Sequence, residues 1–351
     1  RKSPSIQSGL TQRTLGTPAS PPAGTIPHSE PPAPLRKSLG MKTTILLPCS
    51  YFDRDKPDDV FAAEHRAVQD MAELDVRLCN FDEFDEGSNL KLDRPANEPT
   101  TCIWRGWMMT PKQYARFHRQ CGRLGLGLIT SPEAYELMHC FPNACKLINP
   151  GDTPRMVVFG DRMSAGVVNG AFDAFMMKDF VKSVKQTGFP QRIETPLTQD
   201  ECDELTEEFI RLRGDPYTGG IVCKQYVELK RYAMRTNEWR GFYLGGRLLT
   251  LSGNSMQPPT CPKPADDLVA RMEGFASPFY TVDFGELEDG TWTVLETGDG
   301  QVSGLATEIT PEAFYATLTE RLAAEKQRQK CAMLSTKTRP STDPLLRSSN
   351  A

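Results

Sequence analysis

Short apolar runs alternate with segments of helical spacing in the amino-terminal part of the chain. Apolar runs of about four to eight residues are typical of buried strands, and apolar residues three or four positions apart are typical of helices. The expected strands lie at 43–48, 76–79, 101–105 and 124–129, and the expected helices lie at 58–74 and from Pro111 onward. Because strands that alternate with helices usually pair in parallel, this pattern predicts a small α/β domain over residues 41–130.

The carboxyl-terminal part of the chain shows a different order of elements. Thr198 and Glu201 form a capping box at the start of a helix, and Pro311 starts a closing helix that reaches about Lys330. Strands are expected at 155–159, 174–181 and 219–227, and hairpins at 239–251 and 280–296. Because hairpins join antiparallel strands, this part predicts an α+β domain over residues 131–332.

Both ends of the chain have a composition that does not favour a packed core. Residues 1–40 are rich in Pro, Ser and Thr and contain a single acid, Glu30, while residues 333–351 are polar. Such segments cannot bury enough apolar surface to offset the loss of chain entropy. We therefore expect a disordered leader at 1–40, either a targeting segment or a plain extension, and a disordered tail at 333–351.

Charge and cysteine usage narrow the classes of function. A formal net charge of −4 does not favour a nucleic-acid partner, and no apolar run is long enough to span a membrane. Ten cysteines are present, but no two have CxxC spacing and only four histidines accompany them, so a zinc site is not favoured. Reduced thiols in a cytoplasmic protein are the simplest interpretation.

Two acids are expected to face each other in the last predicted hairpin. Asp289-Gly290 is typical of a two-residue hairpin loop, and counting outward from it places Asp283 opposite Glu296. Like charges in that position repel each other, and a bound divalent cation would reverse this effect. Asp299 follows in a Gly-rich turn and is a candidate third metal ligand. The alternative is a solvated sheet end whose acids point apart.

Three cations are candidates for binding an anion beside such a metal. Lys178 interrupts an apolar strand, and burying an ammonium group without an anion is costly. Lys224 stands similarly within a predicted strand. Arg240 opens a hairpin, and its planar fork suits a phosphate or a carboxylate. Lys178 could instead lie on an exposed edge strand.

The order of these residues resembles the ATP-grasp superfamily, and in particular the clade named for two arginines and a lysine. The resemblance covers about residues 42–325. The segments that carry it are 175–183, 219–222, 238–242 and 295–305, with 104–108, 131–132 and 141–143 in the amino-terminal part. It implies a pre-ATP-grasp α/β domain followed by an ATP-grasp fold, in which ATP lies between two α+β lobes.

The resemblance also implies roles for individual residues. Lys178 looks like the lysine on the nucleotide phosphates, and Arg240 like a group that stabilises the transferred phosphoryl group or an acyl phosphate. Asp283 and Glu296 match the magnesium ligands of the family. Gln225, Tyr226, Val227 and Glu228 stand where the family usually has its hinge segment, which contacts the adenine and the ribose of ATP.

The chain departs from the family pattern at two places. Many ATP-grasp proteins end in Glu-x-Asn, and the third position here is Gly298, so Asp299 would have to replace that asparagine as a metal ligand. Lys224-Gln225 stands where relatives often have Arg-Glu. A lysine can still contact phosphate, but as a point charge without bidentate geometry.

The function implied by the resemblance is an ATP- and Mg²⁺-dependent carboxylate–amine ligase. A carboxylate would be activated as an acyl phosphate, and an amine would then displace the phosphate. The substrate would be a small molecule, peptide or protein that supplies the carboxylate and the amine. The alternatives are a kinase on the same fold and a nucleotide-binding module without turnover. Arg105 and the loop at 53–58 are candidates for binding the substrate, or are ordinary residues of the domain surface.

Overall fold

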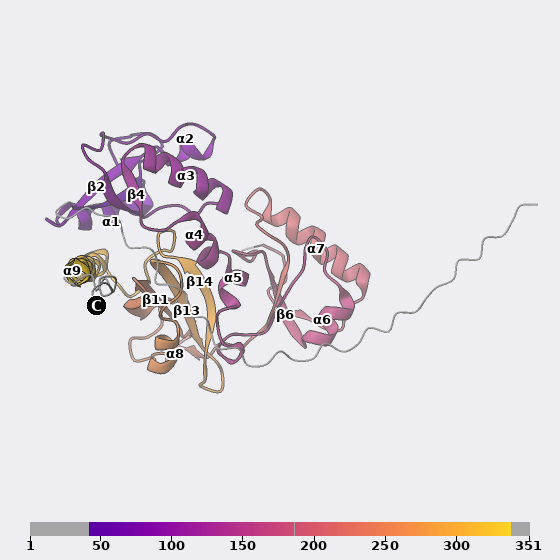
Figure 1. The fold of residues 1–351 in the computed structure, drawn as a ribbon. Helices are drawn as coiled ribbons and strands as arrows, with labels where there is room; N and C mark the ends of the chain where they lie inside the picture. Colours follow the sequence, from indigo (N-terminus) through magenta and orange to yellow (C-terminus); the bar gives the residue numbers. More distant parts are fainter. Residues whose placement is uncertain (1–41, 186, 338–351) are drawn as a thin grey trace, which may run out of the picture. The chain divides into compact units, whose positions relative to one another are not determined.

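The first β-sheet is parallel and begins close to the first described residue. The computed structural model describes residues 42–185 and 187–337 (Figure 1). The strand order is β2-β1-β3-β4. The strands are β1 (Thr43–Pro48), β2 (Leu74–Cys79), β3 (Thr100–Trp104) and β4 (Leu126–Leu128). Every residue of β1 is buried, as expected for a central strand, and the predicted parallel α/β sheet is confirmed.

Helices connect the strands of this sheet. They are η1 (Asp59–Phe61), α1 (Ala62–Gln69), α2 (Phe81–Asp85) and α3 (Pro111–Arg123). Helix α3 starts where the sequence predicts, because Thr110 and Gln113 form a reciprocal capping box and Pro111 occupies the first helical position. Its buried residues Tyr114 and Phe117 pack against Trp104 of β3.

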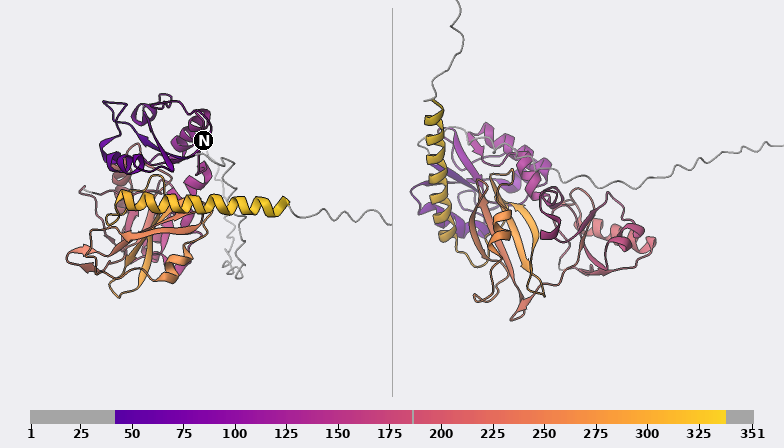
Figure 2. Two further views of the ribbon diagram at one scale, coloured as in Figure 1. Left: turned by 90° about the vertical axis from the view of Figure 1, so that its left-hand side faces the viewer. Right: turned by 60° about the horizontal axis from the view of Figure 1, so that its bottom comes forward.

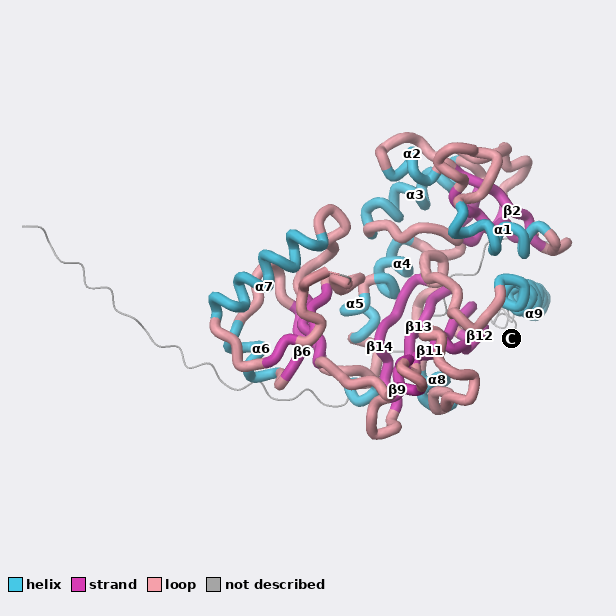
Figure 3. Tube along the Cα trace, turned by 180° about the vertical axis from the view of Figure 1, so that it is seen from behind, coloured by secondary structure: helices cyan, strands magenta, loops and turns pink. Residues whose placement is uncertain are grey.

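The second β-sheet is antiparallel, with strand order β5-β8-β6-β7. Its strands are β5 (Met156–Val158), β6 (Ala174–Lys178), β7 (Ile193–Glu194) and β8 (Val222–Gln225). Helices α6 (Ala165–Ala171) and α7 (Gln199–Arg213) lie beside β6 (Figure 3). Phe175, Met177 and Cys223 pack in the core with these helices. Because side chains alternate along a strand, Lys178 and Lys224 point to the opposite face.

The third β-sheet is also antiparallel, with strand order β12-β11-β13-β14. Its strands are β11 (Glu238–Leu244), β12 (Arg247–Gly253), β13 (Phe279–Glu286) and β14 (Trp292–Asp299). Gly245 and Gly246 connect β11 to β12 with φ angles of 60° and 74°, which a tight two-residue turn requires. The remaining short elements are β9 (Arg231–Tyr232), β10 (Arg235–Thr236), α4 (Pro132–His139), α5 (Phe141–Cys145), η2 (Pro150–Asp152) and α8 (Asp266–Arg271).

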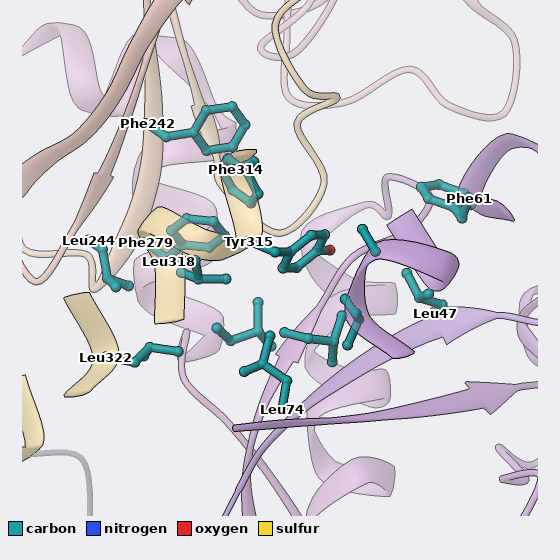
Figure 4. Packing of buried hydrophobic residues seen from close by; sticks show 14 of the residues in the cluster. Leu47, Phe61, Leu74, Phe242, Leu244, Phe279, Phe314, Tyr315, Leu318 and Leu322 are labelled. Atoms are coloured by element: carbon teal, nitrogen blue, oxygen red, sulfur yellow. The ribbon is translucent and has the colours of Figure 1, made fainter. Parts of the chain in front are cut away.

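Helix α9 (Pro311–Lys337) joins the first and third sheets through one hydrophobic core. Figure 2 shows this helix from the side, in yellow. Phe314, Leu318 and Leu322 recur every four residues and are all buried. Figure 4 shows Tyr315 and Leu318 of this helix near Leu47 and the other residues of the same core. The amino-terminal sheet is therefore fixed against the sheet that carries the predicted acid pair.

Most of the expected elements are present, and the differences lie at their ends. Helix α9 continues to Lys337, although we expected a disordered tail from residue 333. The leader at 1–40 and the rest of the tail, at 338–351, lie outside the described residues. The boundary between residues 130 and 131 stays a prediction. None of the helices within 42–185 and 187–337 is long and apolar enough to cross a membrane.

Candidate nucleotide and metal site

A cavity of about 690 Å³ lies between the second and third sheets. Nine of the ten predicted site residues line it, and Asp299 does not. The nine residues are Lys178, Lys224, Gln225, Tyr226, Val227, Glu228, Arg240, Asp283 and Glu296. They come from β6, β8, β11, β13, β14 and the loop after β8, so the fold brings together residues that are more than a hundred positions apart in the sequence.

The acid pair forms, but through a different register from the one predicted. Asp283 does lie opposite Glu296. The hairpin loop, however, has three residues rather than two, because Leu287 donates its N–H to the Thr291 carbonyl and Gly290 adopts a φ of +84°. This shifts the pairs next to the turn by one position. A β-bulge at Leu295 then restores the predicted pairing of the two acids.

Arg240 holds one carboxylate of the pair. It stands opposite Asp283 on the neighbouring strand, and its Nε and Nη2 each donate to an Asp283 oxygen at 2.7 Å. Its Nη1 donates to the Gly304 carbonyl at 2.9 Å. Burial lowers the pKa of the guanidinium, but the Asp283 carboxylate outweighs this and raises the pKa above its ordinary value. Arg240 therefore stays charged at the wall of the cavity.

Lys178 holds the other carboxylate. Its Nζ lies 2.5 Å from Oε1 of Glu296, and the lysine is buried while the glutamate side chain is 37% exposed. Burial raises the pKa of Glu296, but the nearby lysine ammonium groups, Lys178 first among them, together have a larger effect in the opposite direction. The pKa is therefore below its ordinary value, and Glu296 is ionised. The predicted conflict between like charges is thus resolved here by two cations, one for each acid.

Lys224 is a buried cation without an acid of its own. Its Nζ donates to the Leu295 carbonyl, which the bulge presents, and lies 4.4 Å from the centre of the Phe141 ring. The lysine is only 4% exposed. Burial, followed by the charge of Lys178, lowers its pKa to about 7. An anion in the cavity would favour the charged form of this lysine.

The segment 225–228 links the second sheet to the third and forms another wall of the cavity. Gln225 accepts hydrogen bonds from the backbone and side chain of Arg155, each at 3.3 Å, and Glu228 accepts one from Arg192 at 2.9 Å. Within the described ranges, the backbone groups of Val227 make no hydrogen bond. An unpaired N–H and C=O at a cavity wall are suited to the edge of a nucleobase.

Asp299 points away from this cavity. It is fully buried, and its Oδ1 accepts hydrogen bonds from the backbone and the side chain of Gln301 at 3.0 and 3.2 Å. The same Gln301 side chain donates to Tyr114 of α3, and burial raises the pKa of Asp299 to about 7. Because residues alternate along β14, Asp299 and Glu296 lie on opposite faces. We therefore leave Asp299 out of the metal site proposed below.

The comparison with known protein families agrees with this geometry. The family model described as ATP-grasp domain, R2K clade family 3, matches residues 167–318, a segment that contains all ten predicted site residues. Residues 167–318 are called the ATP-grasp domain below, after this match. No curated protein sequence matches the chain at a significant level.

Solved ATP-grasp enzymes share the fold of the chain at low sequence identity. The D-alanine-D-alanine ligase from Coxiella burnetii has a TM-score of 0.53 and 10% identity, covering 84% of this chain and 98% of that one. D-cycloserine synthetase DcsG has a TM-score of 0.51 and 16% identity, with 80% and 99% covered. D-alanyl-alanine synthetase A from Vibrio cholerae O1 biovar eltor has a TM-score of 0.50 and 11% identity, with 82% and 98% covered. At these identities the likeness shows the fold alone.

The two acids of the ATP-grasp domain fit a magnesium ion. Magnesium is usually held by one or two carboxylates, while phosphates and waters complete its shell. Asp283 and Glu296 supply two carboxylates on one face of the sheet. Within residues 42–185 and 187–337 there is no cluster of three or more His, Cys, Asp or Glu side chains that could hold a metal alone. The donor set therefore suits a metal that shares its shell with a nucleotide.

Several residues that the sequence analysis did not assign also line the ATP-grasp cavity. Lys182 and Lys185 follow Lys178 in the loop after β6. Three lysines within eight residues, the first at the end of a buried strand, were a usable signal for them. His139 lies at the end of α4, 4.7 Å from the Tyr135 ring, and burial lowers its pKa to about 4. The position of His139 in its helix is typical of a core residue, so nothing in the sequence indicated that it lines the cavity.

Arg105 is a structural residue and not a substrate ligand. Its Nε and Nη2 donate to Glu64 at 2.9 and 3.0 Å, and its Nη1 donates to the carbonyls of Gly300 and Ser303 at 2.5 and 2.7 Å. Tyr315 also donates to Glu64, at 2.6 Å. Four of its five N–H donors are used within the protein, and with the side chain 1% exposed the group is not accessible to a ligand. Arg105 therefore fits neither expectation, because it is buried in the structure and is not a residue of the domain surface.

Proposed function

We propose that this protein is an ATP- and magnesium-dependent ligase that joins a carboxylate to an amine through an acyl phosphate. The charge of the ATP-grasp cavity is the observation that carries the proposal. Six basic residues line it against four acidic ones. The basic residues are Lys178, Lys182, Lys185, Lys224, Arg231 and Arg240, and the acidic residues are Glu228, Glu238, Asp283 and Glu296. An excess of positive charge around two acids on one face suits a polyphosphate bound with a metal ion.

The nucleotide would lie along the cavity with its base at the segment 225–228. The unpaired backbone groups of Val227 would bind the edge of the adenine. Lys178 and Lys224 are diagonal neighbours across β6 and β8, so both ammonium groups face the same part of the cavity. They would bind the phosphates, with Lys182 and Lys185 available from the loop after β6.

Asp283 and Glu296 would hold magnesium once nucleotide phosphates replace them as partners of Arg240 and Lys178. Bound there, the ion would spread the negative charge that develops on the transferred phosphoryl group. Arg240 has a planar fork that matches a phosphate or an acyl phosphate as well as it matches Asp283. The same guanidinium is therefore placed to stabilise the charge formed in the first step.

The reaction balances without a nucleophile from the protein. A substrate carboxylate oxygen forms a bond to the γ-phosphorus of ATP, and the bond from that phosphorus to the β-phosphate oxygen breaks, which releases ADP. The amine then attacks the acyl carbon and loses a proton, and inorganic phosphate leaves. None of the described cysteines lines the cavity, which suits such a scheme. The likeness of the fold to solved carbon–nitrogen ligases supports ligation over other ATP-grasp reactions.

The proposal is tested by ADP release with Mg·ATP against a library of amino acids and short peptides. We expect ADP release that requires both a carboxylate and an amine. In Glu296→Gln the rate of ADP release should fall by at least about a hundredfold. Circular dichroism of the variant should match the wild type, because Glu296 lies at a cavity wall. A stable phosphorylated product would indicate a kinase instead. Equal turnover in the wild type and Glu296→Gln would contradict the proposed site.

A further inference from the structure

His139 is a buried histidine at the wall of the cavity. The residue is 6% exposed, and it is one of the residues that line the cavity. Its ring packs on Tyr135, but its side chain makes no hydrogen bond or ion pair with any residue of 42–185 or 187–337. Neither ring nitrogen is fully enclosed by the protein. The imidazole can therefore form hydrogen bonds only with what the cavity contains.

The chain just after His139 contacts the lysines that are proposed to bind the phosphates. The centre of the Phe141 ring lies 5.7 Å from Lys178 Nζ and 4.4 Å from Lys224 Nζ. The Phe141 N–H also donates to the carbonyl of Phe180, in the loop after β6, at 2.9 Å. His139 is therefore held at the end of the cavity where the phosphates are proposed to lie.

Strand β14 shows which phosphate would come nearest to this histidine. The Glu288 N–H donates to the Glu228 carbonyl, so the segment 225–228 lies beside the start of β14. The Thr297 hydroxyl donates to the carbonyl of Met138 at 2.9 Å, so the end of α4 lies beside the other end of this strand. Glu296 stands next to Thr297. A nucleotide with its base at 225–228 and its metal ion at Glu296 would direct its last phosphate towards α4.

The imidazole of His139 is uncharged in this position. Burial lowers its pKa to about 4, while the smaller effects of Glu296 and Lys182 oppose each other. At neutral pH the ring therefore carries one N–H donor and one acceptor nitrogen. Lys178 and Arg240 each hold a carboxylate in the free protein, whereas the imidazole has no such contact to break when a phosphate binds.

We propose that His139 is a further catalytic residue, whose uncharged imidazole donates its N–H to an oxygen of the γ-phosphate and then to the same phosphoryl group in the acyl phosphate. An uncharged donor stabilises negative charge on these oxygens without repelling the magnesium ion or the lysines beside it. ADP has no γ-phosphate, so its binding should not depend on this group. The inference rests on the proposed function, because it adds a residue to the same nucleotide site.

Calorimetric titration of the full chain tests this inference without turnover. The probes are the β,γ-imido analogue of ATP and ADP, each with Mg²⁺. His139→Phe keeps a ring against Tyr135 but removes the donor, so the analogue should bind about tenfold more weakly and ADP as in the wild type.

Two further variants and a control sharpen the titration. His139→Asn and His139→Gln each keep an amide N–H near one of the two ring nitrogens, and one of them should restore most of the affinity for the analogue. The matched control is His118→Phe on α3. His118 is a partly buried histidine that does not line the cavity, so both affinities should stay unchanged.

The outcomes separate this inference from the proposed function. An equal loss for the analogue and ADP in His139→Phe, or no loss for either, overturns the inference even if the wild type is a ligase. The same loss in all three His139 variants also overturns it, because the loss would not depend on a donor. A selective loss for the analogue, in a protein that releases ADP with no carboxylate–amine pair, supports the inference and overturns the ligase proposal. If the wild type binds neither nucleotide, both are wrong.

Discussion

Two arginine–carboxylate pairs in this protein have the same geometry and different surroundings. Arg105 and Glu64 form a bidentate pair, as do Arg240 and Asp283. The first pair is 1% and 10% exposed, and both of its members have further partners in the core. The second pair is 20% and 17% exposed and lies at the wall of the cavity. Solvent access and unused hydrogen-bonding capacity, and not the pair itself, distinguish a structural site from a ligand site.

The two pairs hold different parts of the protein together. Arg105 links β3 of the first sheet to the loop after β14, so its pair holds the amino-terminal sheet beside the ATP-grasp domain. Arg240 and Lys178 neutralise the acids of the cavity, and in the proposed function nucleotide phosphates would replace these acids as partners of the two cations.

Removing the buried arginine should give the largest effect on stability. Arg105→Met leaves Glu64 without its cation, and breaking a buried pair in this way costs about 3–5 kcal/mol. Urea denaturation followed by circular dichroism measures the change. The matched control is Arg162→Met, which removes the exposed bidentate pair with Asp203 and should cost less than about 1 kcal/mol. Equal losses in the two variants would contradict a structural role for Arg105.

Changing the cavity arginine should affect turnover instead. Arg240→Lys keeps the charge but loses the planar fork, so we expect kcat to fall about a hundredfold. The free energy of unfolding should change by less than about 1 kcal/mol, because a lysine can still pair with Asp283. Steady-state ADP release and urea denaturation of the same preparation give both values. A large loss of stability with unchanged kcat would reverse the assignment of the two pairs.

Lys224 should take up a proton when a nucleotide binds. Its pKa of about 7 in the folded protein lies below the ordinary value, so at pH 8 most of this lysine is neutral. A bound polyphosphate favours the charged form, and up to about one proton should be taken up. Calorimetry in buffers of different ionisation enthalpy measures this number, and Lys224→Met should abolish the uptake.

The same shift predicts how Lys224 affects stability. Between pH 7 and the ordinary pKa of lysine, the unfolded chain binds more protons at this position than the folded protein does. The contribution of Lys224 to stability therefore rises with pH across that window. Lys224→Met should flatten this part of the stability profile. An identical profile in the variant and the wild type would contradict the shifted pKa.

The smallest effect is expected at Asp299. Asp299→Asn should leave the affinity for Mg²⁺ and nucleotide unchanged, because this side chain points to Gln301 and not into the cavity. Calorimetric titration with Mg·ADP measures the affinity. A loss of affinity as large as that in Glu296→Gln would indicate that Asp299 is a metal ligand after all.

Local patterns predicted most of the fold, and the candidate site residues chosen from patterns and from the family resemblance line one cavity, except Asp299. The acid pair was predicted from its position in a hairpin. The three-residue loop shifts the strand register by one residue, and the bulge shifts it back before the pair. Asp299 was expected in a Gly-rich turn, but β14 continues to this residue, and the alternation of side chains along the strand places it on the far face from Glu296. The partners of Arg105 were out of reach, because Glu64 and Gly300 are 41 and 195 positions away and meet only through packing.

The central claim is that the acids of the cavity exchange their cations for magnesium when a nucleotide binds. Titration with a non-hydrolysable ATP analogue, with and without Mg²⁺, tests it most directly in the wild type and Glu296→Gln. We predict that Mg²⁺ tightens binding to the wild type by at least about tenfold and has little effect on the variant. Tightening by Mg²⁺ that is equal in both proteins, or no binding of the analogue to the wild type, would contradict the account.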